Sequence, residues 1–385
     1  MFEWVHYQFP SRIFLEHDSA HKIGTLVKDI GKRVLLVVIR DEMTNPEKLG
    51  ILQESLNKHT SGCILYDDIA ETPDYSELDT ASHFAKQCNA DVVMAFGTRK
   101  SLNAAKAIAL LSTNEIFAQD LPRSELPLRK PPLPVVSVPS GPALGEECSP
   151  SFYLYDSETR STFHSIDTRL FPALVFLDPS IATTISPTDF VRSTVAILAT
   201  AAESILSKHA NDITTSMALR SIEHIIRNKH SIGTDTQDPK LLRSIYLASL
   251  FSGIAHSITQ LGACYAIATA AHNLIQLDFD TTLTIVLPHL LEYNLTASAA
   301  KYVQIARALE EETSDITVIE AAIKAVEKIR TIITELKIPE RLSEFGVKKA
   351  DLSRIAQQAS QNPLLLNSPR DLDKSELEAI LIASF

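Results

Sequence analysis

The residue pattern changes once along the chain, near Pro187, and this change constrains the fold more than any other feature. Before it, continuous apolar runs too short for helices alternate with segments of helical spacing. We expect buried strands at 33–39, 91–96, 134–139 and 173–178, a weaker one at 62–66 and a polar hairpin at 153–166. Helices are expected between them at 47–58, 76–88 and 101–111. Strands that alternate with helices predict a parallel, Rossmann-like sheet.

After Pro187 the strand pattern disappears and apolar residues recur at helical spacing. Asp373 and Glu376 form a capping-box pattern, and Thr296 is expected to cap a helix that begins at residue 297. A length of 385 residues favours two domains. We therefore predict an α/β domain over 1–180 and an all-helical domain over 181–385, with helices at 187–208, 214–227, 240–257, 262–277, 297–309, 316–336, 348–358 and 374–383.

Charge and apolar content restrict the partners. The formal net charge of -11 argues against a nucleic-acid partner, whose phosphates an acidic surface repels. The longest apolar runs stop far short of a membrane span. The first ten residues lack the apolar core of a signal peptide. The four cysteines have no CxxC spacing, so reduced thiols are expected. We expect a cytoplasmic protein with no membrane partner.

Several strings resemble one known superfamily, in the same order along the chain. They are NAAKAIAL at 103–110, VFLDP at 175–179, LGACYAIA at 261–268, TIVLPHLLEYN at 284–294 and the closing helices at 345–373. The chain resembles the iron-type alcohol dehydrogenase and maleylacetate reductase superfamily, which has the dehydroquinate synthase-like fold. The resemblance implies a dinucleotide on the first domain and, in most members, iron or zinc held by one aspartate and three histidines.

The metal ligands of that superfamily are replaced here. By resemblance the aspartate falls on Ala196 and the histidines on Thr200, Tyr265 and Phe279. None of these is an ordinary ligand of a divalent metal. We therefore expect a divergent, metal-free member. The histidines that metal-free maleylacetate reductases keep fall on Thr269 and Leu283.

The phosphate loop has also changed. The superfamily's three glycines and serine become Gly97, Thr98, Arg99 and Lys100, and the second loop at 139–146 has lost its threonine pair. Glycines serve there because a pyrophosphate must approach backbone N–H groups closely. An arginine at this position is expected to obstruct that approach, although Arg99 and Lys100 could instead attract an anion. We expect no cofactor, with NAD(P) as the alternative.

Five side chains of the helical domain are candidates for catalysis at the inter-domain cleft that the resemblance implies. Tyr265 is either a proton donor or a ring that fills the lost metal volume. Thr200 and Thr269 either orient a substrate or bond backbone carbonyls. Asp280 is either a base or a helix N-cap, and His272 either reaches the cleft or packs in a core or interface.

The favoured hypothesis is a metal-independent enzyme of specialised metabolism. It would carry out non-redox proton-transfer chemistry, such as cyclisation, isomerisation or dehydration, on a small organic substrate. One alternative is an NAD(P)H-dependent reductase of the maleylacetate type, and another is a non-catalytic binding or partner subunit. The resemblance also implies a homodimer.

Overall fold

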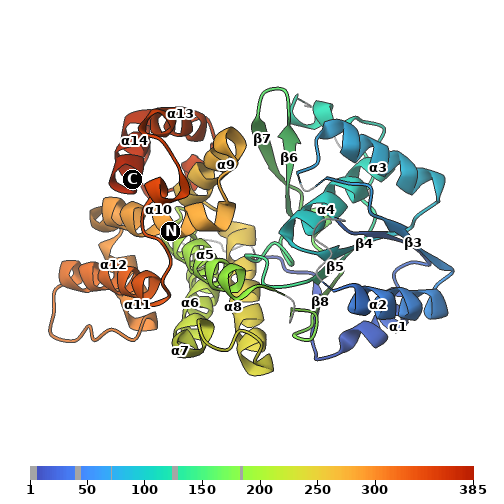
Figure 1. Cartoon of the computed structure of the whole chain (residues 1–385), viewed down its shortest axis with the longest axis horizontal. Helices are drawn as coiled ribbons and strands as arrows, with labels where there is room; N and C mark the ends of the chain where they lie inside the picture. The colour runs from blue at the N-terminus through green and yellow to red at the C-terminus, as the bar shows by residue number, and fades with distance from the viewer. Residues whose placement is uncertain (1–6, 40–44, 71, 124–128, 183–184) are drawn as a thin grey trace, which may run out of the picture. The chain divides into compact units, whose positions relative to one another are not determined.

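A computed structural model describes residues 7–39, 45–70, 72–123, 129–182 and 185–385. The α/β unit spans Gln8–Ser186, and the helical unit contains Pro187–Phe385 (Figure 1). The predicted boundary at residue 180 is therefore six residues early. The chain completes β8, the last strand, and a turn at Asp178–Ile181 before Pro187 starts the first helix of the second unit.

The sheet of the α/β unit has six parallel strands in the order β1-β8-β5-β4-β2-β3, which confirms the predicted fold class. A separate antiparallel hairpin, β6–β7, extends beside α4 (Figure 1). The strands are β1 (Arg12–Leu15), β2 (Arg33–Val37), β3 (Gly62–Tyr66), β4 (Val92–Gly97), β5 (Val135–Pro139), β6 (Ser151–Asp156), β7 (Ser161–Ile166) and β8 (Leu174–Leu177).

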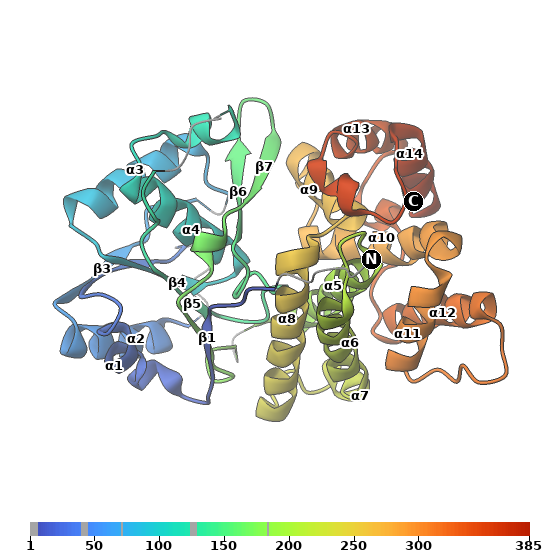
Figure 2. The same ribbon diagram turned by 180° about the vertical axis from the view of Figure 1, so that it is seen from behind.

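Helices cover both faces of this sheet, as Figures 1 and 2 show. Successive side chains of a strand point to opposite faces. In β2, Val34 and Leu36 pack with α1 and α2, whereas Leu35 and Val37 pack with α3 and α4. The covering helices are α1 (Ile23–Val27), α2 (Pro46–His59), α3 (Tyr75–Gln87) and α4 (Arg99–Thr113), with short 3-10 turns at Ser19–His21, Ala118–Arg123 and Thr168–Leu170. Burial on both faces explains why the strands are continuous apolar runs.

Two elements of this unit were not predicted, β1 and α1. β1 has only four residues, and it pairs with β8, far away in sequence. β8 is equally short but fully buried and therefore continuously apolar, whereas β1 begins with an exposed arginine and is only partly buried, so no buried apolar run marks it.

The second unit is helical throughout its described residues, as predicted. Its α-helices are α5 (Pro187–Leu206), α6 (Asp212–Ile226), α7 (Lys229–Ile232), α8 (Pro239–Thr259), α9 (Ala263–Ile275), α10 (Phe279–Asn294), α11 (Ala299–Ala308), α12 (Val318–Glu335), α13 (Lys349–Ala359) and α14 (Lys374–Ala383). Short 3-10 turns lie at Leu295–Ala297, Leu342–Phe345 and Pro363–Asn367.

The capping predictions had mixed outcomes. The capping box of Asp373 and Glu376 is present at the start of α14. The prediction for Thr296 is wrong, because Leu295–Ala297 forms a 3-10 turn and α11 begins two residues later than expected. One described helix, α8, is long and apolar enough to cross a bilayer by length and composition, and it packs against α5 and α6.

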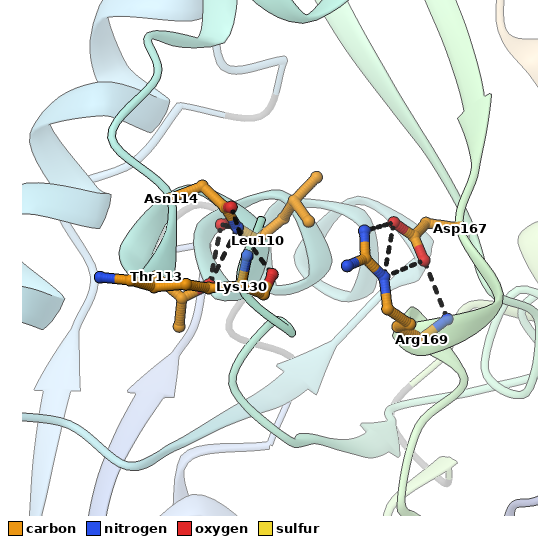
Figure 3. A network of polar contacts seen from close by, with 6 residues as sticks. All are labelled: Leu110, Thr113, Asn114, Lys130, Asp167 and Arg169. Carbon is orange, nitrogen blue, oxygen red and sulfur yellow. Dashed lines mark hydrogen bonds and ion pairs between the residues drawn. The ribbon is translucent and has the colours of Figure 1, made fainter. Parts of the chain in front are cut away.

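The chain after α4 is held by side-chain hydrogen bonds to the backbone (Figure 3). The Asn114 amide donates to the carbonyl oxygens of Leu110 and Lys130, and its oxygen accepts from the Lys130 N–H at 3.1 Å. A second polar contact drawn in Figure 3 joins two residues near the turn before β8, where Asp167 accepts from the Arg169 guanidinium. Residues 124–128 of the predicted linker 121–134 lie outside the described residues.

The two ends of the α/β unit meet at the edge of the sheet. Asp178, directly after β8, is fully buried and its carboxylate accepts from the N–H groups of Asp18, Ser19 and Ser180. This carboxylate fastens the turn that follows β1 to the end of β8.

Candidate functional site

In the α/β unit, the candidate site is the turn between β4 and α4. Gly97 has a φ of +143°, and a Cβ on it would lie 2.6 Å from the Ser101 Oγ. Only glycine suits this backbone without strain. Thr98 caps α4, with its hydroxyl accepting from the Lys100 N–H. The glycine requirement of the resembled loop is therefore retained at its first position.

This turn lies where the sheet reverses its order. The chain leaves β2 toward β3 on one side, whereas β4 pairs with β2 on the other. In open parallel sheets, ligands bind outside the carboxyl ends of the strands at such a switch point. At this switch point lies the N-terminus of α4. Its first-turn N–H groups and the positive end of its dipole suit an anion.

Arg99 is directed toward the second loop of the unit. Its Nε lies 3.9 Å from the Glu146 Oε1, and both side chains are mostly buried. That loop, residues 139–146, is buried along its whole length and includes left-handed backbone at Leu144 and Gly145. The sequence alone could not decide where the arginine side chain would lie.

Two buried side chains of α4 support the second loop and the hairpin. The Lys106 ammonium donates to the carbonyl oxygens of Glu146 and Ser151, at 2.8 and 3.0 Å. Burial lowers the pKa of Lys106 to about 8, against the opposing effect of nearby acidic groups. Asn103, at the superfamily's aspartate position, exchanges hydrogen bonds with the backbone of Tyr153 on β6.

In the helical unit, the ring of Tyr265 packs against Phe279. The ring centroids are 4.8 Å apart, and the planes meet edge-on at 70°. Leu261 and Leu364 complete this apolar cluster, in which Tyr265 is 6% exposed. The two aromatic rings therefore contact each other at two positions that the resemblance assigns to histidines.

The hydroxyls of the two candidate threonines bond mainly to their own helices. Thr200 on α5 donates to the Ile197 carbonyl and is hydrogen-bonded to Ser252 on α8 at 2.8 Å. Thr269 on α9 donates to the Tyr265 carbonyl at 2.9 Å. Backbone bonding of this kind was the structural alternative for both residues. A role in orienting a substrate stays a prediction.

His272 and Asp280 lie at helix ends. The His272 Nδ1 is 3.2 Å from the Leu277 carbonyl oxygen, just after α9. Asp280 accepts from the Ser193 hydroxyl of α5 at 2.9 Å. The N-cap alternative for Asp280 is wrong, because Asp278 caps α10 and accepts from the Thr281 N–H. The cap lies one residue before Phe279, so Asp280 belongs to the first turn.

Sequence reasoning missed Glu203, a buried glutamate of the helical unit whose pKa is raised. It lies on α5 and accepts from the N–H groups of Gly262, Cys264 and Tyr265 at 3.3, 2.7 and 3.4 Å. Burial raises its pKa to about 7, although the three N–H groups favour the charged form. A glutamate within the apolar run of α5 was the available signal.

The positions that would hold iron offer few donor atoms. Ala196 has none, Thr200 is engaged by Ile197 and Ser252, and Phe279 presents an aromatic ring to Tyr265. Among the described residues, no group of three or more His, Cys, Asp or Glu side chains is arranged to hold a metal ion. These side chains do not fit a divalent metal, which needs several strong donors at once.

A parallel α/β unit with a glycine turn after β4, followed by a helical unit, defines a two-unit protein of the dehydroquinate synthase-like class. Two family models match the chain and identify its family. Residues 10–179 match "Iron-containing alcohol dehydrogenase", and residues 190–385 match "Fe-containing alcohol dehydrogenase family, C-terminal". The chain belongs to the iron-containing alcohol dehydrogenase family.

Individual relatives agree over almost the whole chain. A 1,3-propanediol dehydrogenase of Citrobacter freundii is 25% identical, covering 98% of each chain. An NAD-dependent methanol dehydrogenase of Bacillus methanolicus is 21% identical, covering 97% of each. The solved structure of a 1,3-propanediol oxidoreductase superposes with a TM-score of 0.93 at 22% identity and covers both chains completely.

These relatives correct the cofactor expectation. We expected no cofactor, but the matched family is iron-containing and the methanol dehydrogenase is NAD-dependent. The relatives thus point to NAD and iron. The expectation of no cofactor rested on the changed side chains at Thr98, Arg99 and Lys100. Gly97, however, keeps the positive φ that the turn requires.

Proposed function

We propose that this protein is an NAD(P)-dependent oxidoreductase that interconverts a small alcohol and the corresponding carbonyl compound. The family and its relatives, which are dehydrogenases and reductases, support this proposal. The observation that carries it is the Gly97 turn, which lies at the switch point of the sheet and leads into the N-terminus of α4.

The cofactor would supply or accept the hydride. The first-turn N–H groups of α4 would hold its pyrophosphate, with the Lys100 ammonium as a counter-charge. Lys106 joins the second loop to the start of β6, because its ammonium donates to the carbonyl oxygens of Glu146 and Ser151. On the helical unit, the Tyr265 phenol is the proposed proton donor to the substrate oxygen. No step is assigned to iron, because the side chains at the ligand positions do not fit it.

The test is a titration of the purified protein with NADH and with NADPH, in which binding is measured by fluorescence and by calorimetry. We expect saturable binding of at least one of them. Oxidation or reduction of the nicotinamide is then followed by absorbance with a panel of small diols, aldehydes and hydroxy acids. Absence of binding at millimolar concentrations of both dinucleotides would overturn the proposal.

A second candidate function is non-redox proton transfer, such as cyclisation, isomerisation or dehydration in a specialised pathway. The pair of Tyr265 and Phe279 favours it, because this pair stands where the family implies metal ligands for hydride chemistry. The two functions differ in a simple observable. A non-redox enzyme converts its substrate with no change in nicotinamide absorbance.

We also propose that the protein acts on a small organic substrate, lies in the cytoplasm and forms a homodimer. It is proposed to have no nucleic-acid or membrane partner. The acidic balance of the chain supports the exclusion of nucleic acid. Light scattering of the purified protein tests the dimer, and cell fractionation tests the location.

A further inference from the structure

A small cavity lies in the helical unit, beside Gly262, the residue that precedes α9. Its volume is about 10 Å³. Its wall is formed by α5, the end of α10, Gly262 and the segment that precedes α14. The lining side chains with polar atoms include Glu203, Asn294 and Ser368.

Two oxygen atoms of this wall have no hydrogen-bond partner within the described part of the chain. They are the Asn294 Oδ1 and the Ser368 Oγ, on side chains that belong to residues only 2% and 3% exposed. Buried polar atoms of native proteins are almost always satisfied by protein groups or by ordered water. Two unsatisfied oxygens lining one cavity therefore point to a missing partner inside it.

Glu203 provides a third oxygen with spare capacity. Its Oε1 accepts a short hydrogen bond from the Cys264 N–H, at 2.7 Å. Its Oε2 accepts only two long ones, from Gly262 and Tyr265, at 3.3 and 3.4 Å. A carboxylate oxygen has room for another, better donor.

Gly262 brings two of these three residues together. A Cβ on Gly262 would lie 3.0 Å from the Ser368 Oγ and 3.1 Å from the Glu203 Oε1. The Ser368 hydroxyl and the Glu203 carboxyl therefore lie against the same point of the backbone, closer to it than a side chain on residue 262 would comfortably allow.

We propose that a single water molecule occupies this cavity and bridges Glu203, Asn294 and Ser368. The space matches one water, which needs about 10–15 Å³ and two to four polar partners. The chemistry also balances. The Ser368 hydroxyl donates to the water, and the water donates its two protons to the Asn294 Oδ1 and the Glu203 Oε2.

A sodium ion suits the site less well than water. The three N–H groups at the N-terminus of α9 already place positive partial charge at Glu203. The Lys301 ammonium, bonded to the Ser207 carbonyl at 2.9 Å, adds a positive charge at another residue of the cavity wall. An ion would also leave the Ser368 proton without an acceptor.

The bridge joins three segments far apart in sequence. Glu203 lies on α5, Asn294 ends α10, and Ser368 follows the turn Pro363–Asn367. Of the three, Glu203 accepts from the N–H groups of the first turn of α9, which carries Tyr265. The residues that line the water site do not include Tyr265, so the site is distinct from the candidate proton donor.

The direct test is a high-resolution crystal structure of the full chain. We expect one isolated density peak at hydrogen-bond distance, about 2.7–3.2 Å, from all three oxygens. Oxygen-17 magnetic relaxation dispersion in solution should show one fewer long-lived internal water in Asn294→Leu than in the wild type. An empty cavity, or a peak with clearly shorter distances to five or six oxygens, would overturn the proposal.

A double-mutant cycle supplies a second measurement. Asn294→Leu and Ser368→Ala should each lower the Tm by about 2–4 °C, and the double variant should lose little more than either single one, because either change already releases the water. Additive losses would contradict the bridge. Ser384→Ala is the matched control, since the Ser384 hydroxyl is also buried but bonds the Ile380 carbonyl of its own helix. Its effect should add to that of Asn294→Leu.

Discussion

The turn after β4 and the ligand positions of the helical unit have diverged in different ways. At the turn, side chains changed but the backbone stayed, because Gly97 keeps a conformation that other residues rarely adopt. At the positions that the resemblance assigns to metal ligands, apolar or internally bonded groups now stand in a helical unit of the family's fold. A site that works through backbone N–H groups can tolerate new side chains, whereas a site that works through side chains cannot.

The largest expected effect tests the helical unit. Tyr265→Phe keeps the edge-on contact with Phe279 but removes the phenol. If Tyr265 is the proton donor, turnover should fall about 100-fold to 10,000-fold with unchanged NADH affinity. Steady-state kinetics and a binding titration on the same preparation check this. Unchanged turnover would mean that the ring only fills space.

The second effect concerns Glu203, which accepts from the backbone N–H of Tyr265. Because the pKa of Glu203 is raised to about 7 in the folded protein, its favourable contribution is fully present below about pH 4.5 and is lost as pH rises through 7. The loss is up to about 3 kcal/mol of unfolding free energy. The Glu203→Gln variant should lack this decrease, so its stability relative to wild type should improve between pH 5 and 8.

Denaturant unfolding at several pH values measures that difference. Glu327→Gln is the control, as Glu327 is exposed on α12. The control should leave the pH dependence of the wild type unchanged. Parallel curves for wild type and Glu203→Gln would show that Glu203 does not titrate in this range.

A smaller effect tests the backbone turn. Gly97→Ala places a Cβ 2.6 Å from the Ser101 Oγ at a φ of +143°. The strain is of the order of 1–3 kcal/mol, so NADH should bind about tenfold to a hundredfold more weakly. Gly50→Ala is the matched control, because Gly50 has no heavy atom within 4 Å of its Cβ position. Equal affinities for both variants would place the dinucleotide elsewhere.

The smallest effect is expected at Thr269. Its hydroxyl bonds the Tyr265 carbonyl within α9, so Thr269→Val should change the unfolding free energy by no more than about 1 kcal/mol. Turnover should change less than twofold if the hydroxyl serves the helix alone. A larger loss of turnover with normal stability would show that Thr269 contacts the substrate.

The sequence was informative where a pattern repeats over several residues. The bounds of β3 and α14 were predicted as observed, because an apolar run and a capping box mark them. Sequence reasoning failed where a contact between distant residues, or a shift of a helix start by a few residues, decides the outcome. The position of Arg99 beside Glu146 and the burial of Glu203 against α9 depend on residues far away in sequence. The α10 cap is Asp278, two residues before the predicted Asp280, and both aspartates suit a cap.

The pairing of β1 with β8 has a further consequence for how this protein can be dissected. The first and last strands of the α/β unit are parallel neighbours, so the start of β1 and the end of β8 lie at opposite ends of the strands, and joining the two ends of the unit takes a connection that crosses their full length. New termini fit in the exposed tip of the hairpin, at residues 157–160. A circular permutant with such a connection, opened at the hairpin tip, would test whether the α/β unit folds as a separate module.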